Sequence, residues 1–102
     1  MAGTKRDEQG DVLTRTRADK PKRYKVLIHN DDYTTMEFVI HVLQSVFRHT
    51  LPSATRLMLA IHKTGLGIAG VYAREIAETR VEQTLALARE HGHPLQCTME
   101  PE

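Results

Sequence analysis

The sequence predicts an α+β fold: a single small domain in which a three-stranded antiparallel sheet packs against three helices, preceded by a disordered N-terminal tail. Three observations support this prediction. The chain has 102 residues, enough for one domain with a modest core. Its apolar residues are concentrated after residue 22. Beyond that point, strand-like and helix-like patterns follow one another in the order β-α-α-β-α-β, which is typical of helices lying on one face of a small sheet.

The first 22 residues are expected to form a flexible N-terminal extension (1–22), and the rest a folded core domain (23–102). The extension alternates charged and small polar residues, so it has too little apolar surface to offset its ordering entropy. Residues 1–25 contain eight Lys or Arg and four Asp or Glu, a net of +4; the remainder contains six and nine, a net of −3. Because acidic residues are interspersed in the tail, we expect no affinity for nucleic acid.

The folded part begins with a β-rich run, Tyr24–Ile28, that ends at the turn-forming residues Asn30–Asp32. A helix is predicted from about residue 35 to residue 48, because apolar residues recur there at helical spacing. Thr34 and Glu37 fit a capping box at its start, in which the threonine side chain accepts a hydrogen bond from the Glu37 amide.

Four more elements complete the predicted order. Thr50 is expected to cap a second helix, which Gly65 ends. The glycine-punctuated run from Leu66 to Ala73 is predicted to be a strand. A third helix follows from about Arg74 to His91, and Leu95 to Met99 form the last strand.

Composition and motifs exclude several classes of protein. No stretch approaches the roughly 18–20 apolar residues of a membrane span, and the N-terminus lacks the apolar run of a secretory signal. We therefore expect a cytoplasmic protein that does not associate with membranes. The single cysteine, Cys97, excludes a disulfide scaffold. Gly65, Gly67 and Gly70 match G-x-G-x-x-G, but a helical pattern precedes them, so we reject nucleotide binding. The six histidines contain no H-E-x-x-H string, and we expect no metal and no cofactor.

Asn30, Asp31 and Asp32 are the most informative local feature of the chain. Two adjacent carboxylates and an amide lie on a turn between a strand and a helix. They suit an Asx-type turn that complements the helix dipole, and they also suit a site for a cationic group such as an ammonium. On the second helix, His62 lies four residues after Met58, so both project from one face.

If this helix face meets the start of the first helix, Met36 and Val39 join Met58 in an apolar cup. Polar side chains from the turn and from His62 would then form its rim. Methionines suit apolar ligands of different shapes, because the thioether is flexible and polarisable. A purely structural place in the interior stays open for these residues, and for Val39 above all.

Several separated motifs together resemble the ClpS family, the bacterial adaptors that deliver N-end-rule substrates to the ClpAP protease. The resemblance covers about residues 23–100. Its motifs, in chain order, are N-D-D-Y-T at 30–34, M-E-F-V at 36–39, L-M-L-A-I-H at 57–62, G-V-Y at 70–72, E-I-A-E-T at 75–79 and H-P-L at 93–95. It implies a non-catalytic adaptor that recognises a substrate by its free α-amino group and bulky N-terminal side chain (Leu, Phe, Tyr or Trp).

The resemblance also implies which residues hold the substrate. Asn30, Asp32 and His62 would accept hydrogen bonds from the α-ammonium, and His62 must be neutral to do so. The pocket for the side chain would be lined or shaped by six further residues: Asp31, Thr34, Met36, Val39, Met58 and Leu95.

Partners follow from the same resemblance. Glu75 and Arg80, on the third helix, would contact the N-domain of the ClpA unfoldase, and the N-terminal extension would engage the unfoldase during delivery. We expect a monomer. Thr35 stands where the family commonly has proline, which leaves the preference among the bulky N-terminal residues open.

Two alternatives stay open at this point. The first is a protein-docking module of the same fold without specificity for N-terminal residues. The second is a small enzyme that uses Asp31 or Asp32 with His62, although the sequence offers no nucleophile or metal set for it.

Overall fold

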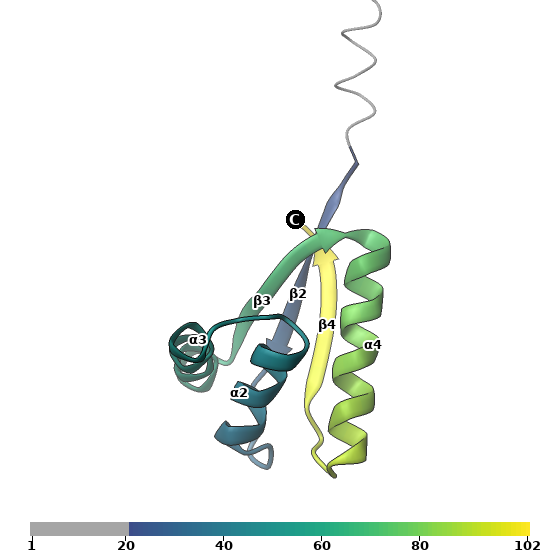
Figure 1. The fold of residues 1–102 in the computed structure, drawn as a ribbon. Coiled ribbons are helices and arrows are strands. Elements are labelled where there is room, and N and C mark those ends of the chain that lie inside the picture. Colours follow the sequence, from purple (N-terminus) through teal and green to yellow (C-terminus); the bar gives the residue numbers. More distant parts are fainter. Residues whose placement is uncertain (1–20) are drawn as a thin grey trace, which may run out of the picture.

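A computed structural model of the chain describes residues 21–102. The prediction for residues 1–20 of the extension lies outside the described residues. The predicted α+β order is confirmed, and Figure 1 shows the six elements. In chain order they are β2 (Arg23–His29), α2 (Met36–Ser45), α3 (Leu51–Thr64), β3 (Leu66–Ala73), α4 (Arg74–Glu90) and β4 (Gln96–Pro101).

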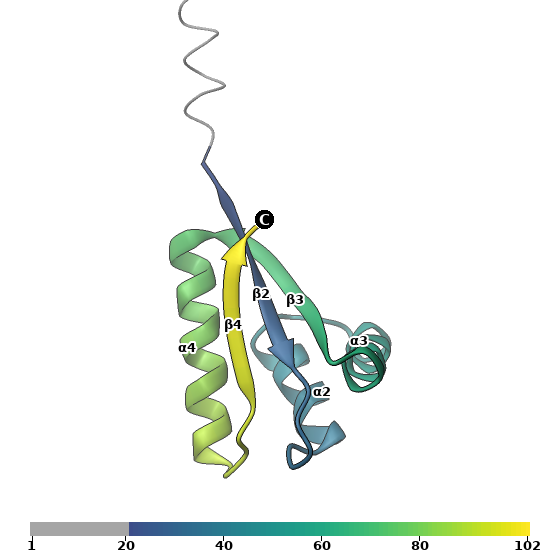
Figure 2. The same cartoon turned by 180° about the vertical axis from the view of Figure 1, so that it is seen from behind.

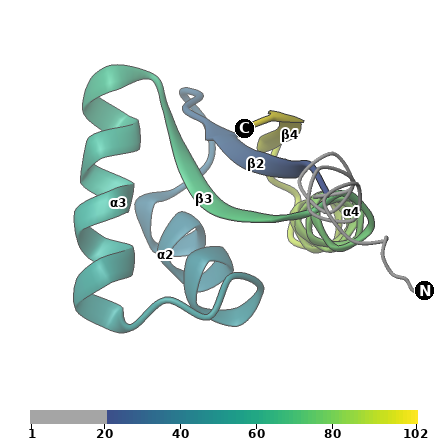
Figure 3. The ribbon, with the colours of Figure 1, turned by 90° about the horizontal axis from the view of Figure 1, so that it is seen from above.

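The three strands form an antiparallel sheet in the order β3-β2-β4. The central strand β2 therefore pairs on both edges, and its Leu27 lies opposite Ile68 on one side and Thr98 on the other. Seen from above, α2 and α3 lie toward one end of the sheet and α4 toward the other (Figure 3). Figure 2 shows the molecule from behind, where the strands lie in front of α2. This arrangement places the end of β2 beside both α2 and α3.

The core lies between the sheet and its helices. Val26 and Ile28 of β2 are fully buried, and they share one core cluster with Val42 and Leu43 of α2, which are buried as well. Leu27 alternates to the opposite face of the strand and is not part of this cluster. Membership of this cluster thus follows the two-residue period of the strand and the helical period of α2, although Leu27 is also buried, at 6% exposed.

The start of α2 differs from the prediction. Thr35, not Thr34, is the N-cap, and its side chain accepts a hydrogen bond from the Phe38 amide at 3.1 Å. The Thr34 hydroxyl is instead engaged with the Asp31 carboxylate, to which it donates at 2.7 Å. The prediction of a Thr34 cap was therefore wrong, because the turn captures that side chain before the helix begins.

The end of α2 also comes earlier than predicted, at Ser45 rather than near residue 48. Arg48 has φ 64°, the left-handed conformation that non-glycine residues rarely adopt. The amide of His49 then bonds back to the Leu43 carbonyl at 3.0 Å. This reversal starts α3 soon after α2 ends.

The ends of α3 and α4 agree with their sequence signals. Thr50 caps α3 by accepting from the Ser53 amide at 3.3 Å, and Gly65 ends it at φ 102°. Gly92, at φ 74°, follows α4, and the amide two residues past the C-cap, that of His93, bonds to the Ala88 carbonyl at 2.8 Å. That pattern is a Schellman motif, which a glycine in this conformation favours.

The start of β2 is joined to the end of β4. Arg23 donates twice to the Glu102 carboxylate, from Nε at 2.9 Å and from Nη2 at 3.0 Å. The Glu102 amide also donates to the Arg23 carbonyl at 2.9 Å. Residues 23 and 102 therefore lie side by side, at the end of β2 opposite to Asn30.

Candidate functional site: an apolar cavity with a polar rim

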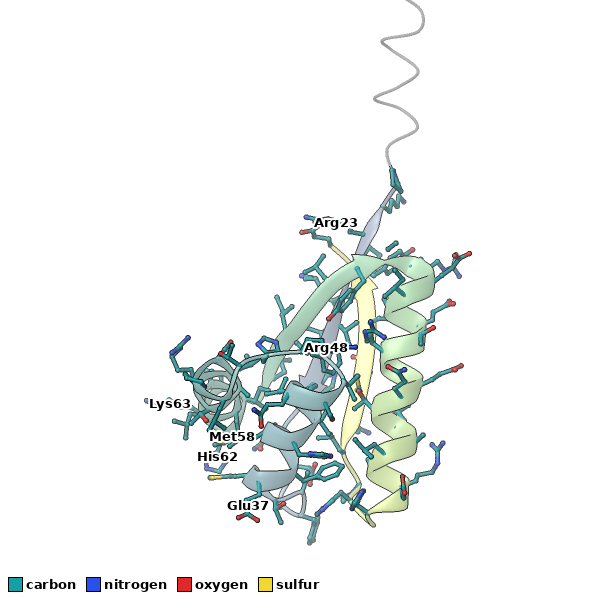
Figure 4. All side chains as sticks on the ribbon, viewed as in Figure 1. Arg23, Glu37, Arg48, Met58, His62 and Lys63 are labelled. Atoms are coloured by element: carbon teal, nitrogen blue, oxygen red, sulfur yellow. The ribbon has the colours of Figure 1, made fainter. Side chains whose placement is uncertain are left out.

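A cavity of about 190 Å³ lies where the loop after β2 meets the start of α2 and the second half of α3. Its volume is below the roughly 300–1,000 Å³ of pockets that enclose drug-sized ligands, so it suits a single side chain. Figure 4 shows Met58 and His62 on α3, beside α2. The cavity is lined by Asn30, Asp31, Asp32, Thr34, Met36, Val39, Met58, Ile61 and His62.

The loop after β2 is folded around the Asp31 carboxylate. One of its oxygens accepts from the backbone amides of Tyr33 at 2.8 Å and Thr34 at 2.7 Å, and the other accepts from the Thr34 hydroxyl. Partial burial by itself raises the pKa of Asp31, but the hydrogen bonds from Thr34 and Tyr33, with a smaller contribution from the charge of His93, outweigh it. The pKa of Asp31 is consequently lowered from its ordinary value.

A hydrogen bond between two backbones joins the two halves of the site. The Asn30 amide donates to the Gly65 carbonyl at 2.8 Å, so the loop after β2 is tied to the C-cap of α3. Because Asp31 uses its oxygens within the loop, Asn30 and Asp32 are the loop residues that present exposed side chains at the rim. His62, exposed on the last turns of α3, completes the rim from the other side.

The interior of the cavity is apolar. Val39 from α2 and Met58 and Ile61 from α3 are buried, and each belongs to the hydrophobic core cluster. Met36, in the first turn of α2, is 45% exposed and therefore lies at the mouth rather than in the interior. The cavity thus combines flexible thioethers at its wall and mouth with branched aliphatic side chains that are held by the core.

The structure brings together eight of the nine residues assigned from sequence to the ammonium and pocket positions. Leu95 is the one that does not line the cavity; it is 4% exposed and belongs to the core cluster. Ile61 lines the cavity and was not assigned to it from sequence. The signal was available, because Ile61 is three residues after Met58 and therefore on the same face of α3.

The two residues assigned to partner contact lie away from the cavity, on α4. Glu75 is exposed in the first turn of this helix. Arg80 lies one turn further on, with its guanidinium 5.6 Å from the centre of the Tyr72 ring and Nη1 donating to Gln83 at 3.2 Å. The contact with Tyr72 holds Arg80 against β3, and the bond to Gln83 holds it along α4.

The glycine pattern and Cys97, two features singled out from the sequence, have places in the fold that explain them structurally. Gly65 ends α3, while Gly67 and Gly70 lie within β3, so the glycine pattern falls on a helix-to-strand turn. Cys97 is buried, and that burial raises the pKa of its thiol to about 11, which keeps it unreactive near neutrality. Within residues 21–102, no cluster of three or more His, Cys, Asp or Glu side chains is arranged to hold a metal ion.

Three histidines gather around one aromatic ring at the end of α4. The centre of the Phe38 ring lies 4.3 Å from that of His93, 5.5 Å from His91 and 6.2 Å from His41. These contacts pack the start of α2 against the loop between α4 and β4.

Among the helices of the described part of the chain, none combines the length and apolar character that a membrane-spanning segment requires.

A small α+β domain with an apolar cavity and hydrogen-bond acceptors at its rim is typical of a protein that binds a small group. The sequence model of the family described as "ATP-dependent Clp protease adaptor protein ClpS" matches residues 19–98. The chain belongs to this family, and it is an adaptor of the Clp protease.

Individual relatives agree with this assignment. The chain is 51% identical over 104 residues to the Clp protease adapter protein ClpS of Desulfatibacillum aliphaticivorans, covering 100% of both chains. It is 52% identical over 90 residues to the ClpS protein of Lawsonia intracellularis, covering 88% of this chain and 83% of the relative. Among solved structures, Agrobacterium tumefaciens ClpS2 bound to L-phenylalaninamide superposes with a TM-score of 0.79 at 44% identity, covering 81% of this chain and 100% of that one.

Proposed function

We propose that the cavity binds the N-terminal residue of a substrate protein, with the α-ammonium at the rim and a bulky Leu, Phe, Tyr or Trp side chain inside. One observation carries this proposal: exposed acceptors from two elements surround the mouth of an apolar cavity of about 190 Å³. An N-terminal residue is the part of a protein chain that joins a cation directly to an apolar group. The solved relative was bound to L-phenylalaninamide, a small molecule with the same two parts.

The chemistry of the rim matches an ammonium group. An ammonium carries three donors and no acceptor, and Asn30, Asp32 and His62 offer an amide oxygen, a carboxylate and an imidazole nitrogen. The imidazole accepts only when it is neutral, so acid should weaken binding. An internal peptide amide has neither the charge nor the three donors. The rim would therefore distinguish a free N-terminus from the rest of a substrate.

The expected strength of binding suits an adaptor that must release its substrate. A hydrogen bond that involves a charged group contributes about 1.5–3 kcal/mol, and burial of one large apolar side chain adds roughly 1.5–3 kcal/mol. Several such bonds, less the entropy lost on association, correspond to a dissociation constant on the order of micromolar.

The second part of the proposal concerns delivery. We assign Glu75 and Arg80 on α4 to contact with the N-domain of the ClpA unfoldase, and residues 1–22 to engagement of that unfoldase. Glu75 is exposed in the first turn of α4, away from the cavity, so both contacts can be made at once. The chain would then hold a substrate without acting on it, and the protease would supply the chemistry.

The test compares two peptides that differ only in acetylation of the N-terminus. Fluorescence anisotropy should show micromolar binding of a Phe-initiated peptide, and the acetylated peptide should bind at least about tenfold more weakly, because it lacks the charge and two donors. His62→Ala should weaken binding of the free peptide by about tenfold or more. Lys63→Ala, at the exposed neighbouring position, serves as the matched control and should leave it unchanged. Equal affinity for both peptides would instead indicate a general docking surface, and turnover of the peptide would indicate an enzyme.

A further inference from the structure

Gly67 of β3 lies directly behind the wall of the cavity. A Cβ atom added to this glycine would be 2.7 Å from Cγ1 and 3.4 Å from Cδ1 of Ile61, and 3.1 Å from Cδ1 of Leu57. Carbon atoms in favourable contact are about 3.5–4.0 Å apart. The missing methyl group is therefore what allows α3 to approach β3 as closely as it does.

The connection between the two elements enforces this approach. α3 ends at Thr64 and β3 begins at Leu66, so Gly65 alone makes the reversal. Its φ of 102° turns the chain straight back along the helix, which places Gly67 against Ile61. The neighbouring strand holds Gly67 within the sheet, since Gly67 pairs with the fully buried Ile28 of β2. Because Gly67 is paired to the central strand, we expect a group added at position 67 to displace the Ile61 side chain rather than the strand.

Ile61 has little room to move except into the cavity. It is 2% exposed, and of the two residues whose atoms would be nearest to the added Cβ, Ile61 lines the cavity and Leu57 does not. Cores are close-packed, so a displaced side chain moves toward whatever open volume adjoins it. For Ile61 that volume is the cavity of about 190 Å³.

We propose that Gly67 is a specificity-determining position: by having no side chain it holds Ile61 back and gives the cavity the depth needed for the largest N-terminal side chains. This inference rests on the proposed function, because it concerns which side chains enter the same cavity. Gly67 does not line the cavity and acts only through Ile61, so it is a positioning residue. The substrate class it admits is that of aromatic N-terminal residues, in addition to leucine.

The experiment measures the affinities of two free peptides that differ only in an N-terminal Trp or Leu. In Gly67→Ala the ratio of Trp-peptide to Leu-peptide affinity should fall about tenfold, the discrimination that one methylene gives in an apolar pocket. A merely structural loss would lower both affinities together and leave the ratio unchanged. Thermal unfolding of each variant shows that it is folded at the assay temperature.

Measuring the effect of Gly67→Ala again in two variants, Ile61→Ala and Leu57→Ala, tests whether the effect passes through Ile61. In Ile61→Ala, which removes both atoms that the new methyl would push, adding Gly67→Ala should leave the ratio unchanged. In Leu57→Ala, the matched control, Gly67→Ala should still lower the ratio about tenfold, because the contact with Ile61 remains. Should the Ile61→Ala protein be unfolded, Ile61→Val removes Cδ1 alone and should reduce the effect.

The possible outcomes distinguish a failure of this inference from a failure of the proposed function on which it rests. If the wild-type chain binds neither free peptide, the proposed function fails and this inference with it. If the wild-type chain binds both, but folded Gly67→Ala keeps the wild-type ratio, the role of Gly67 is overturned and the function stands. An equal change of ratio in the Ile61→Ala and Leu57→Ala backgrounds would also overturn it, because the effect would not pass through Ile61.

Discussion

Asp31 and Asp32 are adjacent and chemically identical, yet the fold gives them different roles. Asp31 points into its own loop and accepts three hydrogen bonds, whereas Asp32 is exposed at the rim of the cavity. The first carboxylate organises the loop that presents the second. A proposed ammonium ligand therefore meets a rim whose geometry depends on the hydrogen bonds that the partly buried Asp31 makes within the loop.

This difference predicts a pH-dependent stability for Asp31→Asn. Because the pKa of Asp31 is lowered in the folded state, its contribution is fully present above the ordinary value of 3.8 and is lost as the pH falls through the lower folded value. At pH 7 the variant should be less stable than wild type by about 1–2 kcal/mol, since bonds to a charged acceptor are replaced by bonds to a neutral one. Below pH 3.8 the difference should shrink progressively, and it should vanish once the pH is below the lowered pKa of the folded state.

Urea unfolding at pH 7 and at about pH 3 measures this difference. Asp32→Asn provides the matched control at the exposed neighbouring position, and its stability should stay within about 0.5 kcal/mol of wild type at both pH values. A loss in Asp31→Asn that is the same at pH 7 and in acid would contradict a role for the Asp31 charge.

Single residues also show which features of the site sequence patterns can predict and which they cannot. Spacing alone placed Met58 and His62 on one helix face, and the turn residues Asn30 to Asp32 at the end of a strand; the structure places all of them at one cavity. The same helical pattern contains Ile61, but periodicity cannot distinguish a wall residue from one in the closed core. That distinction depends on how α2 and α3 sit on the sheet. Leu95, assigned to the pocket by resemblance, is part of the core cluster here, and its assignment stays a prediction.

At the scale of elements, local hydrogen bonds decided what periodicity could not. Thr34 and Thr35 are both suitable helix caps, and the choice between them depended on Asp31, which engages Thr34. Thr84 on α4 is a similar case. It is fully buried although it is polar, and its hydroxyl is satisfied by the Arg80 carbonyl at 2.9 Å. An apolar stripe read from sequence overlooks such a residue, because its partner is its own helix.

The end of α2 provides the prediction at this scale. Arg48 has φ 64°, a conformation that costs an L-residue roughly 1–2 kcal/mol and glycine almost nothing. Arg48→Gly should therefore stabilise the protein by about 0.5–1 kcal/mol, after the greater backbone freedom of glycine in the unfolded chain is subtracted. Its peptide affinity should not change, because Arg48 does not line the cavity.

Chemical denaturation of Arg48→Gly and of Gly65→Ala measures the free energy of unfolding of each variant and so checks that Arg48→Gly is stabilising. The second variant makes the reverse change at φ 102°, where an added side chain is strained, so it should destabilise the protein by about 1 kcal/mol. If Arg48→Gly also proved destabilising, contacts of the arginine side chain would outweigh its backbone strain.

At the scale of the whole molecule, the proposed substrate cavity and the proposed unfoldase contact are on different helices. The cavity is formed with α3, whereas Glu75 lies in the first turn of α4. Figure 3 shows α3 and α4 toward opposite ends of the sheet. The element order that creates this separation followed from sequence patterns. The distance between the two surfaces did not follow from the sequence patterns, since it arises from the pairing of β2 with both β3 and β4.

Because the cavity and the proposed unfoldase contact are separate surfaces, a substitution at Glu75 should change delivery without changing peptide affinity. Glu75→Ala should leave the affinity for a Phe-initiated peptide within about twofold of wild type. It should slow ClpAP degradation of a Phe-initiated protein by roughly fivefold at limiting adaptor, the effect of losing about 1 kcal/mol at an interface. Glu82→Ala, another exposed acid on α4, is the matched control and should not slow it. Equal degradation by the wild-type chain and Glu75→Ala would refute the assignment of Glu75.

The joined ends of β2 and β4 have a practical consequence for handling the protein. Arg23 and Glu102 lie together at one end of β2, and Asn30 follows its other end, so roughly 20 Å of strand separates them from the cavity. A fusion partner, fluorophore or surface attachment placed after Glu102 would sit well away from the cavity. It would also crowd the start of β2 at Arg23, where the N-terminal extension (1–22) ends. Peptide-binding assays should therefore tolerate a C-terminal tag that degradation assays do not.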